Sequence, residues 1–180
     1  ARSRCARHNV TANMVDVTPA VTMLEVAGIS FELSEYDRHL SGDGELRDFG
    51  LEAAEALGLS TDEVFKTLIV VTESDELVVV IAPVSCQVSM KLVATAAGAK
   101  KVTMSAPLAA ERSSGYVVGG ISPLGQRRSL RTIIDESAEL FTTIYVSGGR
   151  RGLDVGLAPT DLINVLDATV APITASQRPL

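Results

Sequence analysis

The chain has 180 residues, which is enough for one ordinary domain. Hydrophobic residues make up 46% of it, aromatic residues only 4%, and tryptophan is absent, so the core has to be built from valine, leucine, isoleucine and alanine. The formal net charge of -6 argues against a protein that holds long duplex nucleic acid by itself, because neutralising phosphates supplies most of the affinity of such proteins. Contact with RNA is therefore expected to be weak or assisted by a partner.

Cysteine content and hydropathy indicate the cellular compartment in which the protein is expected. Cys5 and Cys86 form neither a disulfide framework nor a CxxC pair, which favours a reducing cytoplasm. No run approaches the roughly 18 apolar residues of a membrane span, and no apolar stretch follows the N-terminal arginines as it would in a secretory signal. We expect residues 1–16 to form a flexible tail and residues 17–176 a single domain.

The first half of the domain is predicted to contain helices, one strand and a hairpin. Thr18 and Pro19 suit the start of a helix, and Gly28 suits its end. Alternating apolar residues then predict a half-buried strand, and two nearly continuous apolar runs predict paired central strands. The predicted elements are a helix at 18–27, a strand at 29–36, a loop at 37–48, a helix at 49–57, and strands at 64–71 and 77–82.

The second half continues with short elements of both kinds. They are helices at 90–97 and 105–112, a turn-rich segment at 113–125, strands at 132–135, 142–146 and 153–157, and a helix at 160–166. The strands are paired as hairpins as well as separated by helices. This order predicts an α/β fold with a mixed sheet surrounded by helices, and not a purely parallel doubly wound sheet.

Lys66 is the first residue with chemical interest. Steps of two along its strand place it on the same face as Val64, Leu68 and Val70. Burial of an ammonium group costs free energy unless the group is paired. Either the side chain extends to solvent from the end of the strand, or it lies in a cleft and binds an anion or a carbonyl group.

The glycine-rich segment 115–125 is the second feature. Glycine allows backbone N–H groups to approach a ligand closely, and several such groups can bind an anion or a developing oxyanion. A tight connection between strands is the alternative interpretation. The segment is not a P-loop, because no Gly-Lys-Ser/Thr follows, and it lacks the GxGxxG pattern of a dinucleotide site.

Other candidate residues lie at strand ends and in turns. Asp135 and Tyr36 each end a predicted strand, where they either line a cleft or lie at the surface or the edge of the core. The turn at 147–152 either donates to a phosphate or is a plain surface turn. Basic residues around the glycine-rich segment suit a phosphate-bearing substrate, although a solvated face is the default: Arg112, Arg127, Arg128 and Arg131.

The sequence lacks the residue patterns of several common catalytic mechanisms. The only histidines are His8 and His39, so a Ser-His-Asp triad would depend on His39 alone, with no nucleophile elbow nearby. The residues do not cluster as zinc ligands. We interpret Cys86 as a buried thiol and not as a nucleophile.

Three segments resemble the YbaK/ProX family of aminoacyl-tRNA deacylases. They are Phe-Lys-Thr-Leu at 65–68, Gly-Gly-Ile-Ser-Pro-Leu-Gly at 119–125 and Tyr-Val-Ser-Gly-Gly-Arg-Arg-Gly-Leu at 145–153, and the opening Thr-Pro-Ala at 18–20 agrees with them. The likeness extends from about residue 18 to 172. The second and third strings resemble the branch that acts on Cys-tRNA(Pro). The family also contains Ala-tRNA(Pro) deacylases and the inserted editing domain of bacterial prolyl-tRNA synthetases.

The resemblance implies a mixed, partly barrel-like sheet and a set of site residues. Lys66 falls on the family's site lysine, Tyr36 on its tyrosine and Asp135 on its aspartate, while the amides of Gly119 and Gly120 would bind the aminoacyl carbonyl or the terminal ribose. Catalysis is thus expected from Lys66, Gly119 and Gly120. Further substrate contacts are implied at Thr67, Ile121, Ser122, Pro123, Ser147 and Gly148. One position departs from the family pattern, since Arg38 stands where members carry histidine, with His39 next to it.

The implied reaction is cleavage of the ester between the amino acid and the 3′-terminal adenosine of tRNA, without metal or organic cofactor. The thiol of the substrate itself would attack the ester carbonyl. The expected partners are the cysteine-carrying acceptor end of tRNA(Pro), or of tRNA(Cys), and prolyl-tRNA synthetase, with no membrane and no DNA. The alternatives are an Ala-tRNA(Pro) deacylase and a non-catalytic module that binds prolyl-tRNA synthetase or charged tRNA.

Overall fold

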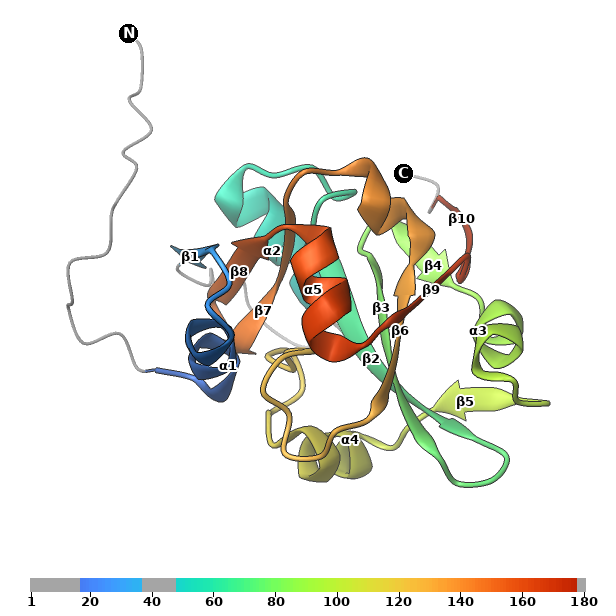
Figure 1. Ribbon diagram of the computed structural model, residues 1–180. Coiled ribbons are helices and arrows are strands. Elements are labelled where there is room, and N and C mark those ends of the chain that lie inside the picture. The colour runs from blue at the N-terminus through green and yellow to red at the C-terminus, as the bar shows by residue number, and fades with distance from the viewer. Residues whose placement is uncertain (1–16, 37–47, 178–180) are drawn as a thin grey trace, which may run out of the picture.

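The computed structural model describes residues 17–36 and 48–177, drawn as the coloured ribbon of Figure 1. The predicted tail at 1–16, Arg38 and His39 lie outside the described residues. The helices of the described part are α1 (Pro19–Ala27), α2 (Phe49–Leu57), α3 (Met90–Ala97), α4 (Pro107–Ser114), the 3-10 helix η1 (Glu136–Leu140) and α5 (Pro159–Leu166). Its strands are β1 (Phe31–Glu35), β2 (Phe65–Thr72), β3 (Leu77–Pro83), β4 (Cys86–Val88), β5 (Val102–Met104), β6 (Arg131–Asp135), β7 (Ile144–Arg150), β8 (Leu153–Leu157), β9 (Thr169–Ala171) and β10 (Thr174–Gln177).

Capping residues set the ends of the helices. Thr18 accepts a hydrogen bond from the Val21 amide at 3.3 Å, and Gly28 ends α1 in the left-handed conformation with φ of 66°. The helix predicted at 105–112 lies at α4 because Pro107 suits the first helical turn. No helix in the described part of the chain is both long and apolar enough to cross a membrane.

Two larger sheets build the body of the domain. The first has the order β5-β2-β3-β6-β9, with antiparallel pairs on both sides of β2 and parallel pairs on both sides of β6. The second has the antiparallel order β1-β8-β7, and β4 pairs separately with β10. A backbone bridge between Val64 and Tyr145 connects the two larger sheets beside β2. The predicted mixed α/β fold is confirmed, although the described strands do not close into a barrel.

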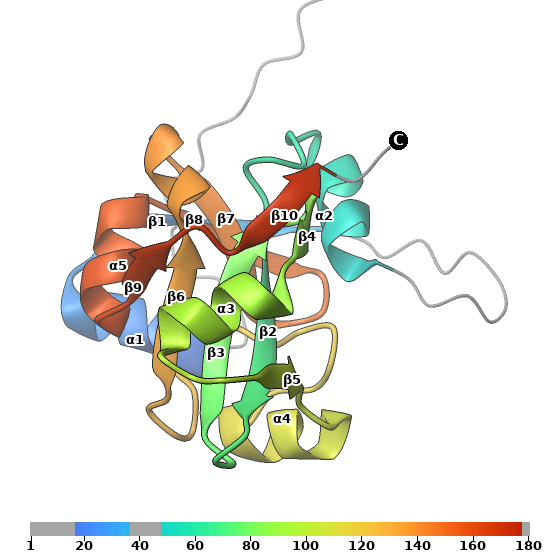
Figure 2. The ribbon, with the colours of Figure 1, turned by 90° about the vertical axis from the view of Figure 1, so that its right-hand side faces the viewer.

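Strand β2 lies between two apolar clusters. Phe65 and Ile69 belong to a core that also contains residues of β7, β8, α1, α4 and α5. Val70 joins a second cluster beneath α3, which Figure 2 shows lying across β2 and β3. A polar side chain on this central strand is therefore surrounded by apolar ones unless a cavity opens beside it.

The strands that the sequence pattern did not predict are short or contain glycine. Strands β4, β5 and β9 have three residues each, too few to display a period of two. Cys86, which lies outside every strand predicted from sequence, begins β4. Strand β7 continues through Gly148 and Gly149, although paired glycines usually mark a turn. A Cβ atom at Gly148 would lie 2.7 Å from the Leu153 side chain, so close packing against β8 requires glycine there.

Candidate functional site

A cavity of about 590 Å³ opens beside β2. Its walls come from β2, the start of α2, α4, the loop after α4, and the paired strands β7 and β8. Six of the residues predicted from sequence line it: Tyr36, Lys66, Thr67, Gly119, Ile121 and Ser147. Another hollow, of about 670 Å³, lies beside α1, but Thr22 is the only polar residue among the described side chains around it. The chemistry of the molecule is therefore centred on the cavity beside β2.

Lys66 brings a positive charge to the cavity wall. Its Nζ donates a hydrogen bond of 2.6 Å to the carbonyl oxygen of Cys86, so the start of β4 fixes the position of the ammonium group. The residue is half-buried and lines the cavity, which agrees with the cleft interpretation of the two considered from sequence. An ammonium group held by a carbonyl dipole can bind an anion or polarise an ester carbonyl.

Thr67 supplies an unsatisfied hydroxyl group. Its Oγ1 is buried and has no hydrogen-bond partner in the structure, although the residue lines the cavity. Buried hydroxyl groups in proteins nearly always have a partner, and an exception requires an explanation. A polar atom of a bound ligand would supply the missing hydrogen bond.

Asp154 is the site residue that the sequence analysis missed. It is the second residue of β8, lines the cavity and is only 5% exposed. Its β-sheet partners are Ser147 on β7 and Ser34 on β1. Burial raises the pKa of its carboxyl group to about 7, and no described residue forms a hydrogen bond or ion pair with it. An acid that titrates near neutral pH can exchange a proton with a substrate.

The loop after α4 is held rigidly where it meets the cavity. The Val118 amide donates to Glu111 Oε1 at 2.9 Å, and Arg151 donates to the Val118 carbonyl oxygen through Nε and an Nη atom, at 2.9 and 2.6 Å. The Arg151 guanidinium also lies 5.3 Å from the centre of the Phe49 ring on α2. These contacts connect the loop to α4, α2 and the β7–β8 turn.

The two glycines of this loop differ in what they can offer. Gly119 lines the cavity with φ of 86°, and a Cβ atom there would lie 2.8 Å from the Phe49 ring. The Gly120 amide donates to the Val117 carbonyl at 2.9 Å, so this N–H group is occupied within the loop. The amide of Gly119 makes no hydrogen bond within the described residues. Of the two predicted amides, Gly119 is therefore the one placed to meet a ligand.

Sequence comparison now identifies the kind of domain that carries this cavity. The family model described as "Aminoacyl-tRNA editing domain" matches residues 45–165, which include both the β2 wall and the β7–β8 wall. The chain belongs to this family. The resemblance to the YbaK/ProX deacylases noted from the sequence motifs is thereby confirmed.

Relatives of the editing domain agree with this assignment. A protein of Enterococcus faecalis named "Putative Cys-tRNA(Pro)/Cys-tRNA(Cys) deacylase EbsC" is 31% identical over 163 residues, which are 89% of this chain and 94% of the relative. Two crystal structures share the fold. That of "hypothetical protein APE2540" has a TM-score of 0.78 at 22% identity and covers 88% of this chain and 100% of its own. That of "a putative trans-editing enzyme for prolyl tRNA synthetase" has a TM-score of 0.75 at 19% identity and covers 88% of this chain and 96% of its own.

The editing domain places the other predicted site residues outside the cavity lining. Asp135 is 2% exposed and caps η1: its Oδ1 accepts from the amide and hydroxyl groups of Ser137, and its Oδ2 accepts from the Ile173 amide. The remaining four pack inside the protein or against neighbouring backbone: Gly120, Ser122, Pro123 and Gly148. A direct substrate contact by these five residues stays a prediction.

Charge at the cavity is organised by ion pairing and not by metal ligands. Arg150 lines the cavity and forms an ion pair with Glu35 on β1. Within 17–36 and 48–177, no three side chains of His, Cys, Asp or Glu are grouped to hold a metal ion. The functional groups of the described lining residues include the Lys66 ammonium group, the Arg150 guanidinium group, the Asp154 carboxyl group, hydroxyl groups and backbone amides.

Proposed function

We propose that the chain is an aminoacyl-tRNA deacylase that hydrolyses Cys-tRNA(Pro), with Cys-tRNA(Cys) as a second substrate. Membership of the editing-domain family supports the general activity, and the name of the 31% identical relative supports the amino acid. The observation that carries the proposal is the composition of the cavity. Lys66, Thr67 and Asp154 line one cavity, the Thr67 hydroxyl is buried without a partner among the described residues, and the pKa of the Asp154 carboxyl group is raised to about 7.

Binding of the ester would use the polar groups of opposite walls. Lys66 and the Gly119 amide would stabilise the negative charge that develops on the carbonyl oxygen, because fixed donors in an enclosed site require little reorganisation. The Thr67 hydroxyl would bond to the terminal ribose or to the amino acid. A cavity of about 590 Å³ has room for a terminal nucleoside and a small amino acid, as ligand pockets of roughly 300–1,000 Å³ do.

The nucleophile would come from the substrate. Asp154 in its carboxylate form would accept the proton of the cysteinyl thiol, the sulfur would attack the ester carbonyl, and the bond to the ribose 3′-oxygen would break. That oxygen would receive the proton back from Asp154, and water would then open the resulting thiolactone. Holding two groups of one molecule in reactive geometry is itself a large rate effect. No cysteine is among the described residues that line the cavity, which favours a thiol supplied by the substrate.

The test is a panel of charged tRNAs with the purified protein. We expect fast cleavage of Cys-tRNA(Pro) and Cys-tRNA(Cys), and slow cleavage of Ser-tRNA(Pro), Ala-tRNA(Pro) and a Cys-tRNA(Pro) whose thiol has been methylated. The double variant Cys5→Ala, Cys86→Ala should keep its activity. Fast hydrolysis of Ala-tRNA(Pro) would instead assign the alanine branch, and binding of charged tRNA without turnover would assign a non-catalytic module.

Discrimination among tRNAs would come from a partner, prolyl-tRNA synthetase, in the cytoplasm. A chain with net charge -6 is expected to hold tRNA weakly by itself. The measurement is an anisotropy titration of tRNA(Pro) and other tRNAs with the protein alone and with added synthetase. Selective, tight binding of tRNA(Pro) by the protein alone would contradict this part of the proposal.

A further inference from the structure

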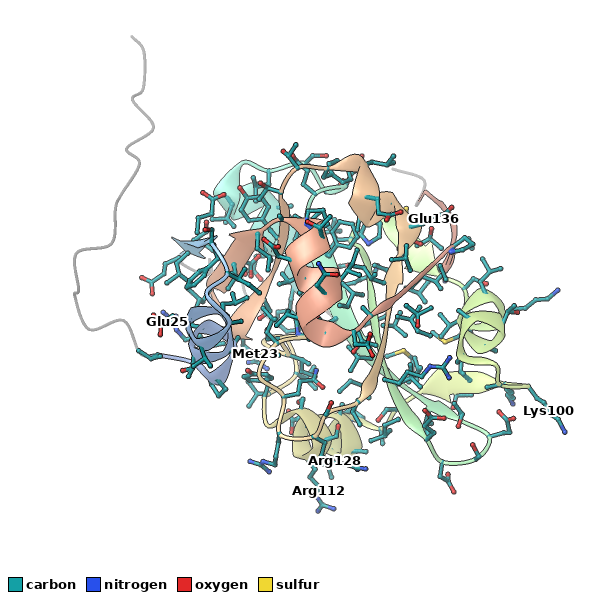
Figure 3. The ribbon with its side chains drawn as sticks, in the orientation of Figure 1. Met23, Glu25, Lys100, Arg112, Arg128 and Glu136 are labelled. Carbon is teal, nitrogen blue, oxygen red and sulfur yellow. The ribbon has the colours of Figure 1, made fainter. Side chains whose placement is uncertain are left out.

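Three arginines gather at the end of α4. Arg112 is in the last turn of the helix. The backbone amides of Arg127 and Arg128 donate to the carbonyl oxygens of Ser114 and Ser113, at 2.9 and 3.1 Å, so the following loop is fastened to the same end of the helix. Figure 3 shows the labelled side chains of Arg112 and Arg128 at α4. Arg131, grouped with them in the sequence, instead donates to the Ala96 and Ala97 carbonyls of α3.

Among the described residues, no partner accounts for these arginines. All three are exposed, and in the part of the chain that the structure describes their guanidinium groups form no ion pair or hydrogen bond. The nearest acid along α4, Glu111, is engaged with the Val118 amide. A favourable interaction with the helix dipole accounts for a cation in the last turn, which is Arg112, but not for the two arginines of a separate loop. Three exposed cations at one place, unpaired within 17–36 and 48–177, suit a polyanion even in a chain of net charge -6.

The route from the cavity to these arginines is apolar and exposed. Pro107 and Ala110 of α4 line the cavity, whereas Leu108 is 67% exposed. Leu108 and Arg112 are four residues apart and therefore adjacent on the outer face of the helix. Met104, beside the start of α4, lines the cavity and is 51% exposed.

We propose that Arg112, Arg127 and Arg128 bind the backbone phosphates of the RNA strand whose 3′ end enters the cavity. The apolar side chains between them and the cavity would contact the faces of the unpaired bases. This inference rests on the proposed function, because that function places the 3′ end in the cavity. The recognition involves phosphates and not base edges, so it is expected to be independent of sequence.

The experiment compares two double variants that remove the same charge. Arg112→Gln, Arg128→Gln removes two of the three arginines, and Arg127 is left in place because its side chain packs over Gly115. Lys100→Gln, Lys101→Gln is the control, because both lysines are exposed and Figure 3 shows Lys100 far from the labelled arginines. Binding of uncharged tRNA is measured by anisotropy across a salt series. The slope of log affinity against log salt should become shallower by about 1.4 in the arginine variant, since each phosphate contact on a single strand contributes about 0.7, and should not change in the control.

Two substrates separate this surface from the catalytic proposal. With cysteinyl-tRNA, the arginine variant should show a raised KM and an unchanged kcat. With the 3′-cysteinyl ester of adenosine, which has no upstream phosphate, it should match the wild type. The proposal would be overturned if the two double variants had equal salt slopes, or if the arginine variant bound tRNA as tightly as the wild type. The arginines would then be assigned to binding an acidic protein instead. Failure of the wild type to cleave either ester would overturn the proposed activity, while the binding titration would still test the surface.

Discussion

The last position of β6 and the second position of β8 each carry a buried aspartate, and the two differ in their surroundings. Asp135 on β6 is 2% exposed, and its two oxygens accept three hydrogen bonds from Ser137 and Ile173. Asp154 on β8 is 5% exposed, faces the cavity lining and has no such donors, so burial raises the pKa of its carboxyl group. A satisfied buried carboxylate stabilises a fold, whereas an unsatisfied one at a cavity has proton chemistry to offer.

Asp154→Asn is expected to have the largest effect on activity. The amide keeps the shape of the carboxyl group but cannot accept a proton, so kcat/KM on Cys-tRNA(Pro) should fall by about 10² to 10⁴, the usual range for a general base. In the wild type, kcat/KM should rise with pH through about 7, where the carboxyl group ionises, and the variant should lack this inflection. An unchanged inflection in the variant would remove Asp154 from the mechanism.

The same substitution should stabilise the protein at alkaline pH. The folded-state pKa of about 7 lies above the unfolded value of about 3.9, so the folded state binds this proton more tightly. The contribution of Asp154 to the free energy of unfolding of the wild type is therefore fully present below about pH 4, and it is lost as the pH rises to about 7. The loss is on the order of 4 kcal/mol at most, from about 1.4 kcal/mol for each pKa unit. Urea denaturation at pH 5 and pH 8 should show a smaller difference for Asp154→Asn than for the wild type.

Lys66→Met should have the next largest effect. Methionine keeps an apolar stem of similar length but removes the ammonium group, so kcat/KM should fall by about 10² to 10³ if that charge stabilises the oxyanion. The melting temperature should change by only a few degrees, because the half-buried side chain keeps its apolar stem and the hydrogen bond to Cys86 contributes only modestly. Lys101→Met on the surface is the matched control and should keep wild-type activity. A Lys66→Met enzyme with normal kcat/KM would show that the lysine has a purely structural role.

Sequence reasoning reached the fold and six of the residues that line the cavity. Some features can be recognised from neighbouring residues alone, without knowledge of the fold. They include the apolar runs of β2 and β3, the capping residues of α1 and the GGISPLG string. Lys66 was noticed because a charge interrupts an apolar strand. Asp154 interrupts the β8 run Leu-Asp-Val-Gly-Leu in the same way, so the signal was present there as well.

What could not be predicted depends on contacts between distant segments. Whether a buried aspartate is satisfied is decided by residues far along the chain, such as Ile173 for Asp135. The two ends of the glycine string have different roles for the same reason. Gly119 lines the cavity, whereas Gly125 packs against the backbone of Pro19. A Cβ atom added at Gly125 would lie 2.3 Å from the Pro19 carbonyl oxygen. Sequence alone treats both glycines as members of one loop.

Gly120→Ala should reduce stability and activity together. A Cβ atom there would lie 2.9 Å from the Arg151 backbone nitrogen, which cannot move aside as a flexible side chain would. Overpacking of this kind costs about 1–3 kcal/mol, and displacement of the loop should lower kcat/KM several-fold through Gly119. Differential scanning fluorimetry and the deacylation assay on the same preparation provide the two readouts. Full stability with lost activity would instead indicate that Gly120 itself contacts the substrate.

Asp135→Asn should have the smallest effect on activity and a clear effect on stability. The amide nitrogen of asparagine cannot accept a hydrogen bond, so either the Ile173 amide or the Ser137 pair loses its acceptor, which costs about 1–3 kcal/mol for a buried group. At 25 °C, where the variant remains folded, kcat/KM should stay within about twofold of the wild type, because the side chain does not line the cavity. The variant repeats at β6 the substitution made at Asp154 on β8, and the expected results are opposite: weaker folding with normal catalysis here, and stronger folding at pH 8 with lost catalysis there. A folded Asp135→Asn protein with strongly reduced kcat/KM and unchanged stability would return Asp135 to the site, as the sequence resemblance had implied.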